Sequence, residues 1–330
     1  MDSTQRFRSA AEGPRPGIKA PALVFVGSCT LDTIGMVGDF PEPDSRTIAA
    51  DLVTAGGGPA ATAAVAAARA GARTAFLGSV GADEAGDRVL AGLQDEGVDV
   101  RGVTRQAGQA TGASIIIVAS AGATRAIITR PVAPLDLDHA IARDLLRAAD
   151  WVHVDHIGWP ALHALRMHAD SAFDFRLSID GGNPIAGLQL RETDLYVPTL
   201  DRLTTTSAPG PSVIEAALQG ALAEGAATVV ATQGANGAWT LDDDGLLVHV
   251  APPVVEVRST LGAGDVFHGA LVAAMATGYG TKESVEYAVD TAAVSCAGLD
   301  GRSAIPRRIL PPSPAGRPSG QHLGCTAERA

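Results

Sequence analysis

One segment constrains the fold of this chain more than any other, because it predicts a helix whose side chains are nearly all small. Residues 59–70 read Pro-Ala-Ala-Thr-Ala-Ala-Val-Ala-Ala-Ala-Arg-Ala; Gly56–Gly58 precede them and Gly71 follows. Proline at the first position and glycine just past the end are typical of a helix with these bounds. Since nearly every face carries only small groups, we expect this helix to pack tightly and to be largely buried.

Strand-like and helix-like segments alternate along much of the chain, which predicts an α/β fold. A buried strand is expected at 22–26, another at 74–80, and a helix at 84–96. Later segments repeat the pattern. Strands are expected near 151–154, 177–180, 195–197 and 228–232, a hairpin at 238–241 and 246–250, and helices at 265–276 and 282–296.

Two extended segments interrupt the alternation, within about 34–54 and 113–131. The second turns at residues 120–122 like a hairpin, so we expect a small inserted sheet that covers one edge of the core as a lid. No repeat or composition break divides the region 21–310, which predicts one domain with a lid. Residues 1–20 lack the apolar core of a signal peptide, and 311–330 are rich in proline, serine and glycine; both are expected to be disordered.

The composition excludes several partners. With 36 acidic and 25 basic residues the formal net charge is −11, so neither nucleic acid nor an anionic membrane is an expected partner. No apolar stretch is long enough for a membrane span. The three cysteines are scattered, which argues against a disulfide framework and suits the reducing cytoplasm. An anionic ligand must therefore be held by a local arrangement of groups in a cytoplasmic protein.

Lysine is nearly absent, and this excludes two large classes of phosphoryl-transfer protein. Lys19 and Lys282 are the only two lysines, and neither lies in a Gly-Lys-Ser/Thr loop or beside a His-Arg-Asp loop. The chain is therefore neither a P-loop protein nor a protein kinase.

The segment Leu261-Gly-Ala-Gly-Asp265 carries the strongest chemical signal. Its glycines allow a tight turn, and the helix expected to follow directs its positive end and free N–H groups at the same place, which suits a phosphoryl group. A carboxylate beside such an anion hole can accept the proton of an attacking hydroxyl. The competing interpretation of Asp265 alone is a helix-capping residue.

Two further features suit hydroxyl groups. Gly56–Gly58 would offer backbone groups to a sugar, with Thr62 one turn inside the helix; the alternative is a flexible helix start. Asp32 follows the first strand and would accept hydrogen bonds from adjacent hydroxyls; the alternative is a turn residue.

Taken together, these motifs resemble those of the ribokinase-like, or PfkB, carbohydrate kinase family. The similarity lies in Gly57–Gly71, in Gly78-Ser-Val-Gly-Ala-Asp-x-x-Gly86 and in Leu261–Asp265, and it covers about residues 21–306. It implies a doubly wound, mainly parallel α/β sheet flanked by helices with a small β-sheet lid. It also implies MgATP and a small sugar as substrates, and a homodimer formed through the lid.

The resemblance assigns a role to each matching position. Asp265 is implied to be the base, with Gly262, Ala263 and Gly264 as the anion hole. The implied sugar contacts are Asp32, Gly57, Gly58 and Thr62. The implied ATP contacts are Thr199, Thr232, Gly234, Gly237 and Thr260.

The chain also departs from the family pattern. Thr62 and Leu261 stand where Asn and Thr are common. Ser259 replaces an acid that often belongs to a monovalent-cation site, so potassium dependence stays open. Thr199 and Arg202 align with the Asn-x-x-Glu motif that organises magnesium, so the metal ligands are unknown.

The substrate stays open among ketoses, sulfosugars, phosphosugars and pentoses. In wording the motifs are most similar to those of sulfofructose kinases, and the strand at 151–154 to that of ketohexokinases. Arg46 and Arg130, on expected lid strands, would suit a sulfonate, or simply form a solvated lid face. Asp155, at a strand end, is a candidate sugar contact.

The sequence leaves three alternatives to a sugar kinase. A nucleoside kinase and a catalytically quiet sugar- or nucleotide-binding regulator are compatible with the same fold. A metallohydrolase built on His153, Asp155 and His156 is disfavoured because Trp151 stands where its first histidine would be.

Overall fold

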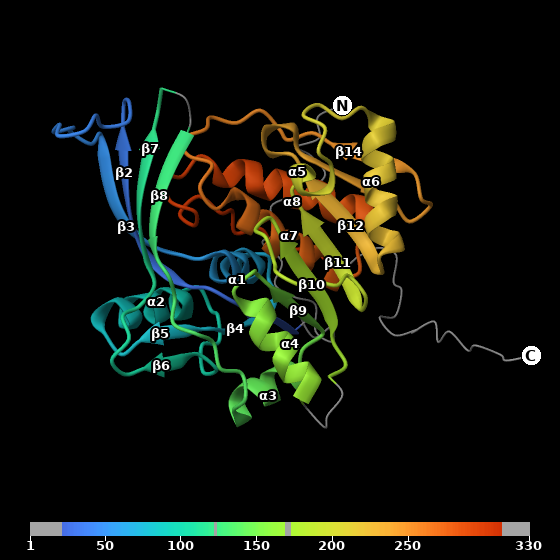
Figure 1. Ribbon diagram of the computed structural model, residues 1–330, viewed down its shortest axis with the longest axis horizontal. Helices are drawn as coiled ribbons and strands as arrows, with labels where there is room; N and C mark the ends of the chain where they lie inside the picture. The colour runs from blue at the N-terminus through green and yellow to red at the C-terminus, as the bar shows by residue number, and fades with distance from the viewer. Residues whose placement is uncertain (1–21, 122–123, 169–172, 312–330) are drawn as a thin grey trace, which may run out of the picture.

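A computed structural model describes residues 22–121, 124–168 and 173–311 (Figure 1). The segments predicted to be disordered, 1–20 and all but the first residue of 311–330, lie outside the described residues. The main sheet has eight strands in the order β14-β13-β12-β11-β10-β9-β1-β4. The six strands from β12 to β4 are parallel, and β13 and β14 are added antiparallel. Their bounds are β1 Ala22–Val26, β4 Arg73–Leu77, β9 Trp151–Val154, β10 Arg176–Gly181, β11 Thr193–Pro198, β12 Ala226–Thr232, β13 Ala238–Leu241 and β14 Leu247–Val250.

Helices cover both faces of this sheet, so each parallel strand is buried on two sides. In β1, Leu23 and Phe25 belong to the core on the face of α1, α7 and α8, whereas Val24 and Val26 belong to the core on the face of α3 and α4. The bounds of the helices are α1 Pro59–Arg69, α2 Glu84–Asp95, α3 Ala140–Arg147, α4 Gly158–His168, α5 Leu200–Leu203, α6 Pro211–Ala223, α7 Ala263–Ala276 and α8 Thr281–Ser295.

The predicted alanine helix is confirmed as α1, and every residue from Ala60 to Ala67 is buried. It contacts α7 along its length, and Val65 and Leu271 lie in the same core cluster. A Cβ on Gly269 of α7 would overlap the carbonyl oxygen of Ala63, so the two helices approach closely at this glycine, in the first half of each.

A separate four-stranded sheet stands beside the main one, in the order β3-β2-β7-β8 (Figure 1, blue to green). Its strands are β2 Thr30–Val37, β3 Asp51–Gly57, β7 Ala113–Ala119 and β8 Thr124–Arg130. Ile34, Ile116 and Val118 on its inner face pack with Leu299 and partly buried Leu261. We call this sheet the lid; its inner face lies against the loop that precedes α7.

Two strand predictions were wrong in detail. Residues 38–50 form a loop rather than part of a continuous strand pair, since three prolines or glycines interrupt it: Gly38, Pro41 and Pro43. The strand expected at 74–80 is divided at Gly78 into β4 and the short β5 (Ser79–Gly81), which pairs with β6 (Thr104–Gln106) in a two-stranded sheet.

The carboxyl ends of the parallel strands meet at the edge where the lid and α7 converge. In an open α/β sheet this edge is the usual place for a ligand. Among the helices of the described ranges, none is both long and apolar enough to cross a membrane.

Candidate active site

The loop before α7 forms a turn that only glycine adopts easily. Gly262 has φ 73°, in the left-handed region, and a Cβ there would lie 2.9 Å from the Cα of Gly301. The helix starts at Ala263, so the N–H groups of Gly264 and Asp265 fall in its first turn. Within the described part of the chain neither N–H has a hydrogen-bond partner, as expected where a helix begins. Free N–H groups at a positive helix end favour an anion.

Asp265 lies in the first turn of α7, partly exposed. Burial of its carboxyl group, together with the nearby Asp180 carboxylate, raises the pKa of Asp265 to about 7; His268 acts in the opposite direction. A carboxyl group with a pKa near neutrality is suited to take up and release a proton at physiological pH.

A buried polar network lies behind Asp265 and was not foreseen from the sequence. Nε2 of His268, three residues along α7, lies 3.1 Å from Oδ1 of Asp180 at the end of β10. The ring of His153 in β9 lies 5.2 Å from that of His268, and its Nδ1 is 2.9 Å from Oγ of Ser178.

The charges of this network are fixed by their surroundings. Burial by itself lowers the pKa of His268, but the Asp180 carboxylate outweighs it, and the pKa is raised. Burial by itself raises the pKa of Asp180, but His268 outweighs it, and the pKa is lowered. Burial, with a smaller contribution from His268, lowers the pKa of His153 to about 3, so His153 stays neutral.

Asp32 lies in β2 with only 7% of its surface exposed, and burial raises its pKa. Its Oδ1 is buried and has no hydrogen-bond partner among the residues that the structure describes. A Cβ on Gly57, across the strand pair, would overlap the Asp32 carboxylate. The lid strands therefore present an unsatisfied acceptor at a position where only glycine leaves room for it.

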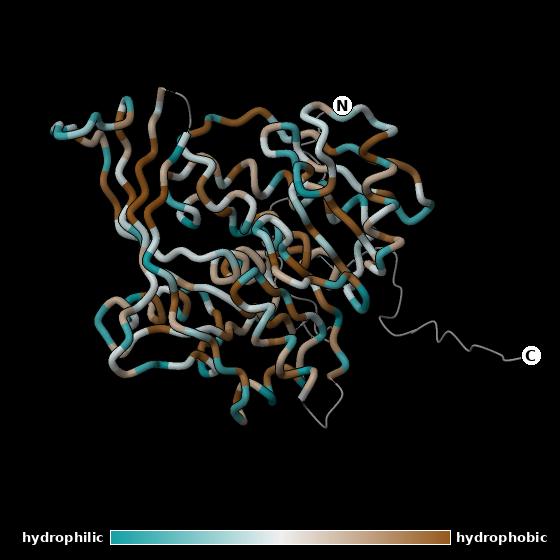
Figure 2. Tube along the Cα trace, in the orientation of Figure 1, coloured by the Kyte–Doolittle hydropathy of each residue, from teal (hydrophilic) through white to brown (hydrophobic). Residues whose placement is uncertain are grey.

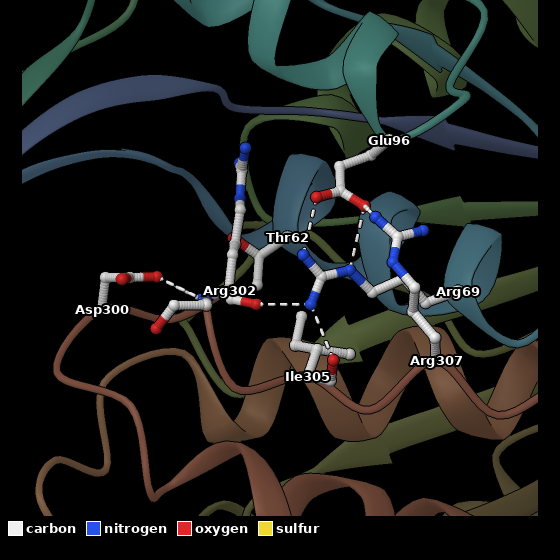
Figure 3. A network of polar contacts seen from close by, with 8 residues as sticks. Thr62, Arg69, Glu96, Asp300, Arg302, Ile305 and Arg307 are labelled. Carbon is white, nitrogen blue, oxygen red and sulfur yellow. Dashed lines mark hydrogen bonds and ion pairs between the residues drawn. The ribbon is translucent and has the colours of Figure 1, made fainter.

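Arg302 is a second residue that sequence reasoning missed. It follows α8, and its side chain reaches the start of α1 (Figure 3). Nε donates to Oγ1 of Thr62 at 3.2 Å, and Nη2 donates to the carbonyl oxygen of Gly57 at 2.7 Å. No periodicity or motif marked this arginine, because its partners lie 240 and 245 residues away.

Asp155 is fully buried and does not face an open site. Its carboxylate accepts backbone hydrogen bonds from Ser28 (2.8 Å), Ala60 (3.3 Å), Ile157 (2.9 Å) and Gly158 (2.8 Å). It ties the end of β1 to the starts of α1 and α4. This arrangement is that of a residue that positions loops, unlike the sugar contact that the sequence suggested.

Of the two arginines expected on lid strands, Arg130 lies on one and Arg46 does not. Arg46 lies exposed in the loop at 38–50 and on no strand. Arg130 ends β8, and its Nε and Nη2 donate to the carbonyl oxygen of Thr111 at 3.1 and 2.7 Å. Within the described residues, no hydrogen bond or ion pair joins either arginine to Asp32 or Asp265.

Four of the five residues expected at the nucleotide lie at or just after the ends of β11 and β12. Thr199 forms an isolated bridge with Thr232. Gly234 and Gly237 shape the turn after β12. The fifth, Thr260, precedes the anion-hole turn, and its Oγ1 accepts a hydrogen bond from Nη1 of Arg125 in the lid at 2.8 Å.

Proteins similar to this chain are carbohydrate kinases. Residues 20–308 match the model of the pfkB family carbohydrate kinases. Ketohexokinase of Mus musculus is 28% identical over 300 residues, covering 86% of this chain and 98% of that protein. Ribokinase of Schizosaccharomyces pombe is 27% identical over 307 residues, covering 86% and 94%.

The fold has counterparts among solved structures. The structure of Arabidopsis thaliana ribokinase complexed with ribose and ATP superposes with a TM-score of 0.74 at 24% identity, covering 88% of this chain and 97% of that one. The predicted ribokinase-like fold class is therefore confirmed. With a family match over most of its length, this chain belongs to the pfkB family of carbohydrate kinases.

Proposed function

We propose that this sugar kinase transfers the γ-phosphoryl group of MgATP to a primary hydroxyl of a small sugar, with a ketose favoured. The observation that carries the proposal is Asp265, whose pKa is raised to about 7 beside the unpartnered N–H groups of the α7 start. An alcohol acceptor needs a base, and the transferred phosphoryl group needs donors; the two lie in one helical turn.

In this proposal, the reaction is a direct displacement. The sugar oxygen bonds to the γ-phosphorus as the bond between that phosphorus and the β,γ-bridging oxygen breaks, and ADP leaves. The Asp265 carboxylate accepts the proton of the attacking hydroxyl. The N–H groups of Gly264 and Asp265 stabilise the charge on the phosphoryl oxygens, which is where such interactions lower a barrier most. Ala263 continues the turn that aims them.

The sugar is proposed to lie between α7 and the lid. Asp32 would accept a hydrogen bond from a hydroxyl at its unpartnered Oδ1, next to Gly57, Gly58 and Thr62. The lid contact with Leu261 would exclude water from the phosphoryl group, as closure does in many kinases.

ATP is proposed to lie along Thr199, Thr232, Gly234, Gly237 and Thr260. Mg²⁺ would enter with the nucleotide as MgATP. Magnesium keeps several waters and is usually bound through substrate phosphates with one or two carboxylates, so a dedicated cage is not required. We assign it no ligand in the chain.

The preference for a ketose rests on similarity to mouse ketohexokinase, a resemblance of 28% identity. A sulfosugar or a nucleoside is the second choice within the same chemistry. A sulfonate requires cationic partners. Among the described residues, no hydrogen bond or ion pair links Arg46 or Arg130 to Asp32, and the Arg130 guanidinium donates to the carbonyl oxygen of Thr111. Neither arginine therefore supports a sulfosugar.

We further propose a homodimer formed through the lid, acting in the cytoplasm. The lid strands are apolar along much of their length (Figure 2). The exposed fractions of Leu52, Ile115 and Ile128 are 67%, 57% and 67%, and the last two are directly paired. An exposed apolar sheet face favours association.

A sugar panel tests the proposed function. Purified protein is incubated with MgATP and D-fructose, D-ribose, sulfofructose or a nucleoside, and ADP and sugar phosphate are measured. One sugar is expected to be phosphorylated, and Asp265→Asn is expected to lower kcat by at least about 100-fold while the protein stays folded. A variant with undiminished turnover would refute the assignment of the base; a wild type that binds a sugar without turnover would favour a quiet regulator.

A further inference from the structure

The guanidinium of Arg302 is a buried charge without an ionic partner. Only 8% of the residue is exposed. Within the described part of the chain, no carboxylate oxygen lies within 4.0 Å of it, and its two hydrogen-bond acceptors, Oγ1 of Thr62 and the carbonyl oxygen of Gly57, are neutral. A buried charge is costly unless it is well satisfied, so this arrangement needs a reason.

The third nitrogen of that guanidinium, Nη1, takes no part in these two hydrogen bonds. Nη1 lies beside Gly56, since a Cβ on that glycine would stand 2.5 Å from it. No acceptor for Nη1 is found among the residues that the structure describes. Arginine carries its donors in a rigid planar fork, so fixing Nε and Nη2 also fixes the direction of the two N–H bonds on Nη1.

An unsatisfied acceptor lies nearby on the same strand pair. Oδ1 of Asp32 is buried and has no hydrogen-bond partner among the described residues, and Gly57, next to Gly56 in β3, leaves room for the other oxygen, Oδ2. The carboxylates of Asp32 and Asp265 both lie within electrostatic reach of Arg302. The guanidinium of Arg302 thus lies beside Gly56, and the Asp32 carboxylate lies, through its Oδ2, beside the next residue, Gly57.

The backbone that carries Arg302 is held firmly (Figure 3). Oδ1 of Asp300 accepts hydrogen bonds from N–H of Arg302 and Ser303, both at 2.7 Å. Nη1 of Arg69 donates to the carbonyl oxygens of Arg302 and Ile305 at 2.8 and 2.7 Å. Glu96 in turn holds Arg69 and Arg307. A donor fixed before binding loses little entropy when a ligand arrives.

We propose that Arg302 is a specificity-determining residue of the acceptor site, whose Nη1 donates a hydrogen bond to one oxygen of the sugar while a neighbouring hydroxyl donates to Oδ1 of Asp32. The inference rests on the proposed function and names the pair of groups that selects its substrate. Because Asp32 and Asp265 are both acidic, a neutral hydroxyl oxygen fits this place better than a second anion.

The test compares Arg302→Gln with wild type, using D-fructose as the probe and D-ribose as a second probe. Loss of a charge-assisted hydrogen bond is expected to raise KM for the sugar about 10- to 100-fold, with KM for ATP changed less than about twofold. Arg302→Lys keeps the charge without the fork and is expected to recover only part of the loss. Arg101→Gln, at an exposed arginine paired with Asp99, is the matched control.

Single-deoxy analogues of fructose separate recognition from a structural role. One analogue is expected to lose affinity in wild type and to lose no more in Arg302→Gln, because the contact is already absent. An equal penalty for every analogue, or equal rises in KM for sugar and ATP with a lower melting temperature, would overturn the inference.

Calorimetric binding without ATP keeps the two proposals apart. Fructose that binds tightly but is never phosphorylated overturns the proposed function alone. Equal affinities of wild type and Arg302→Gln for the sugar overturn the role of Arg302 alone. A wild type that binds neither fructose nor ribose also counts against the role of Arg302, since no neutral sugar then reaches Nη1.

Discussion

His268 and Asp180 form a buried ion pair, with Nε2 and Oδ1 3.1 Å apart, directly behind the residue proposed as the base. One partner stands on α7 and the other ends β10. The pair therefore joins the helix that starts at the anion hole to the sheet edge.

Asp180→Asn is expected to destabilise the protein by about 3–5 kcal/mol, because removing one partner leaves a buried, uncompensated histidine. The raised pKa of His268 means that its contribution is complete below its ordinary value of 6.5 and is lost as pH rises through the folded value. The lowered pKa of Asp180 means that its contribution is present above 3.8. In urea unfolding, Asp180→Asn should therefore lower the free energy of unfolding more at pH 5.5 than at pH 8. Asp144→Asn, in an exposed pair, is the control.

The rate should depend on the ionisation of Asp265. Since its pKa is raised to about 7, kcat/KM is expected to rise tenfold per pH unit below that value and to level off above it. The measurement is a profile of initial rates from pH 5 to 9. A flat profile across pH 6–8, with chemistry rate-limiting, would contradict a base with this pKa.

The same shift predicts an effect on stability. An acid whose pKa is higher in the folded state loses stabilisation as pH rises from 3.8 to about 7. Asp265→Asn removes this loss, so the variant should be more stable than wild type. The difference in melting temperature should grow between pH 4 and pH 7 and then stay constant.

Asp155→Asn distinguishes a loop-positioning residue from a sugar contact. The amide replaces one acceptor oxygen by a donor that faces backbone N–H groups of Ser28, Ala60, Ile157 and Gly158. Unsatisfied buried groups cost about 1–3 kcal/mol each, so a loss of about 2–5 kcal/mol in unfolding free energy is expected. A stable variant with only a raised KM for sugar would instead restore the sugar contact.

Gly57→Ala is expected to raise KM for the sugar at least about tenfold, because the new methyl group would displace the Asp32 carboxylate. KM for ATP should change little. Gly92→Ala in α2 is a matched control, since nothing lies within 4 Å of its added Cβ and alanine favours a helix. Equal sugar KM values for the two variants would remove Gly57 from the site.

Local signals in the sequence were sufficient for most of the predicted elements and for the turn before α7. Pro59 and Gly71 bound a helix through backbone preferences of their own, and the structure has it at Pro59–Arg69. Gly262 lies in the tight turn that its motif predicted, in the left-handed conformation. The P-loop was excluded from the sequence alone, because that motif needs a lysine at a fixed place in a short segment and neither Lys19 nor Lys282 lies in one.

Contacts between distant segments were decided only by the tertiary structure. Arg302 donates a hydrogen bond to Thr62, which lies 240 residues away in the chain. Asp155 was expected to contact the sugar at a strand end, but its carboxylate accepts hydrogen bonds from backbone groups of three segments. The sequence by itself predicted an α/β sugar kinase and a tight glycine turn before Asp265, since those signals are local. It did not determine the pKa of Asp265 or the position of the Arg302 guanidinium near Asp32. Burial and electrostatics depend on which residues packing brings together.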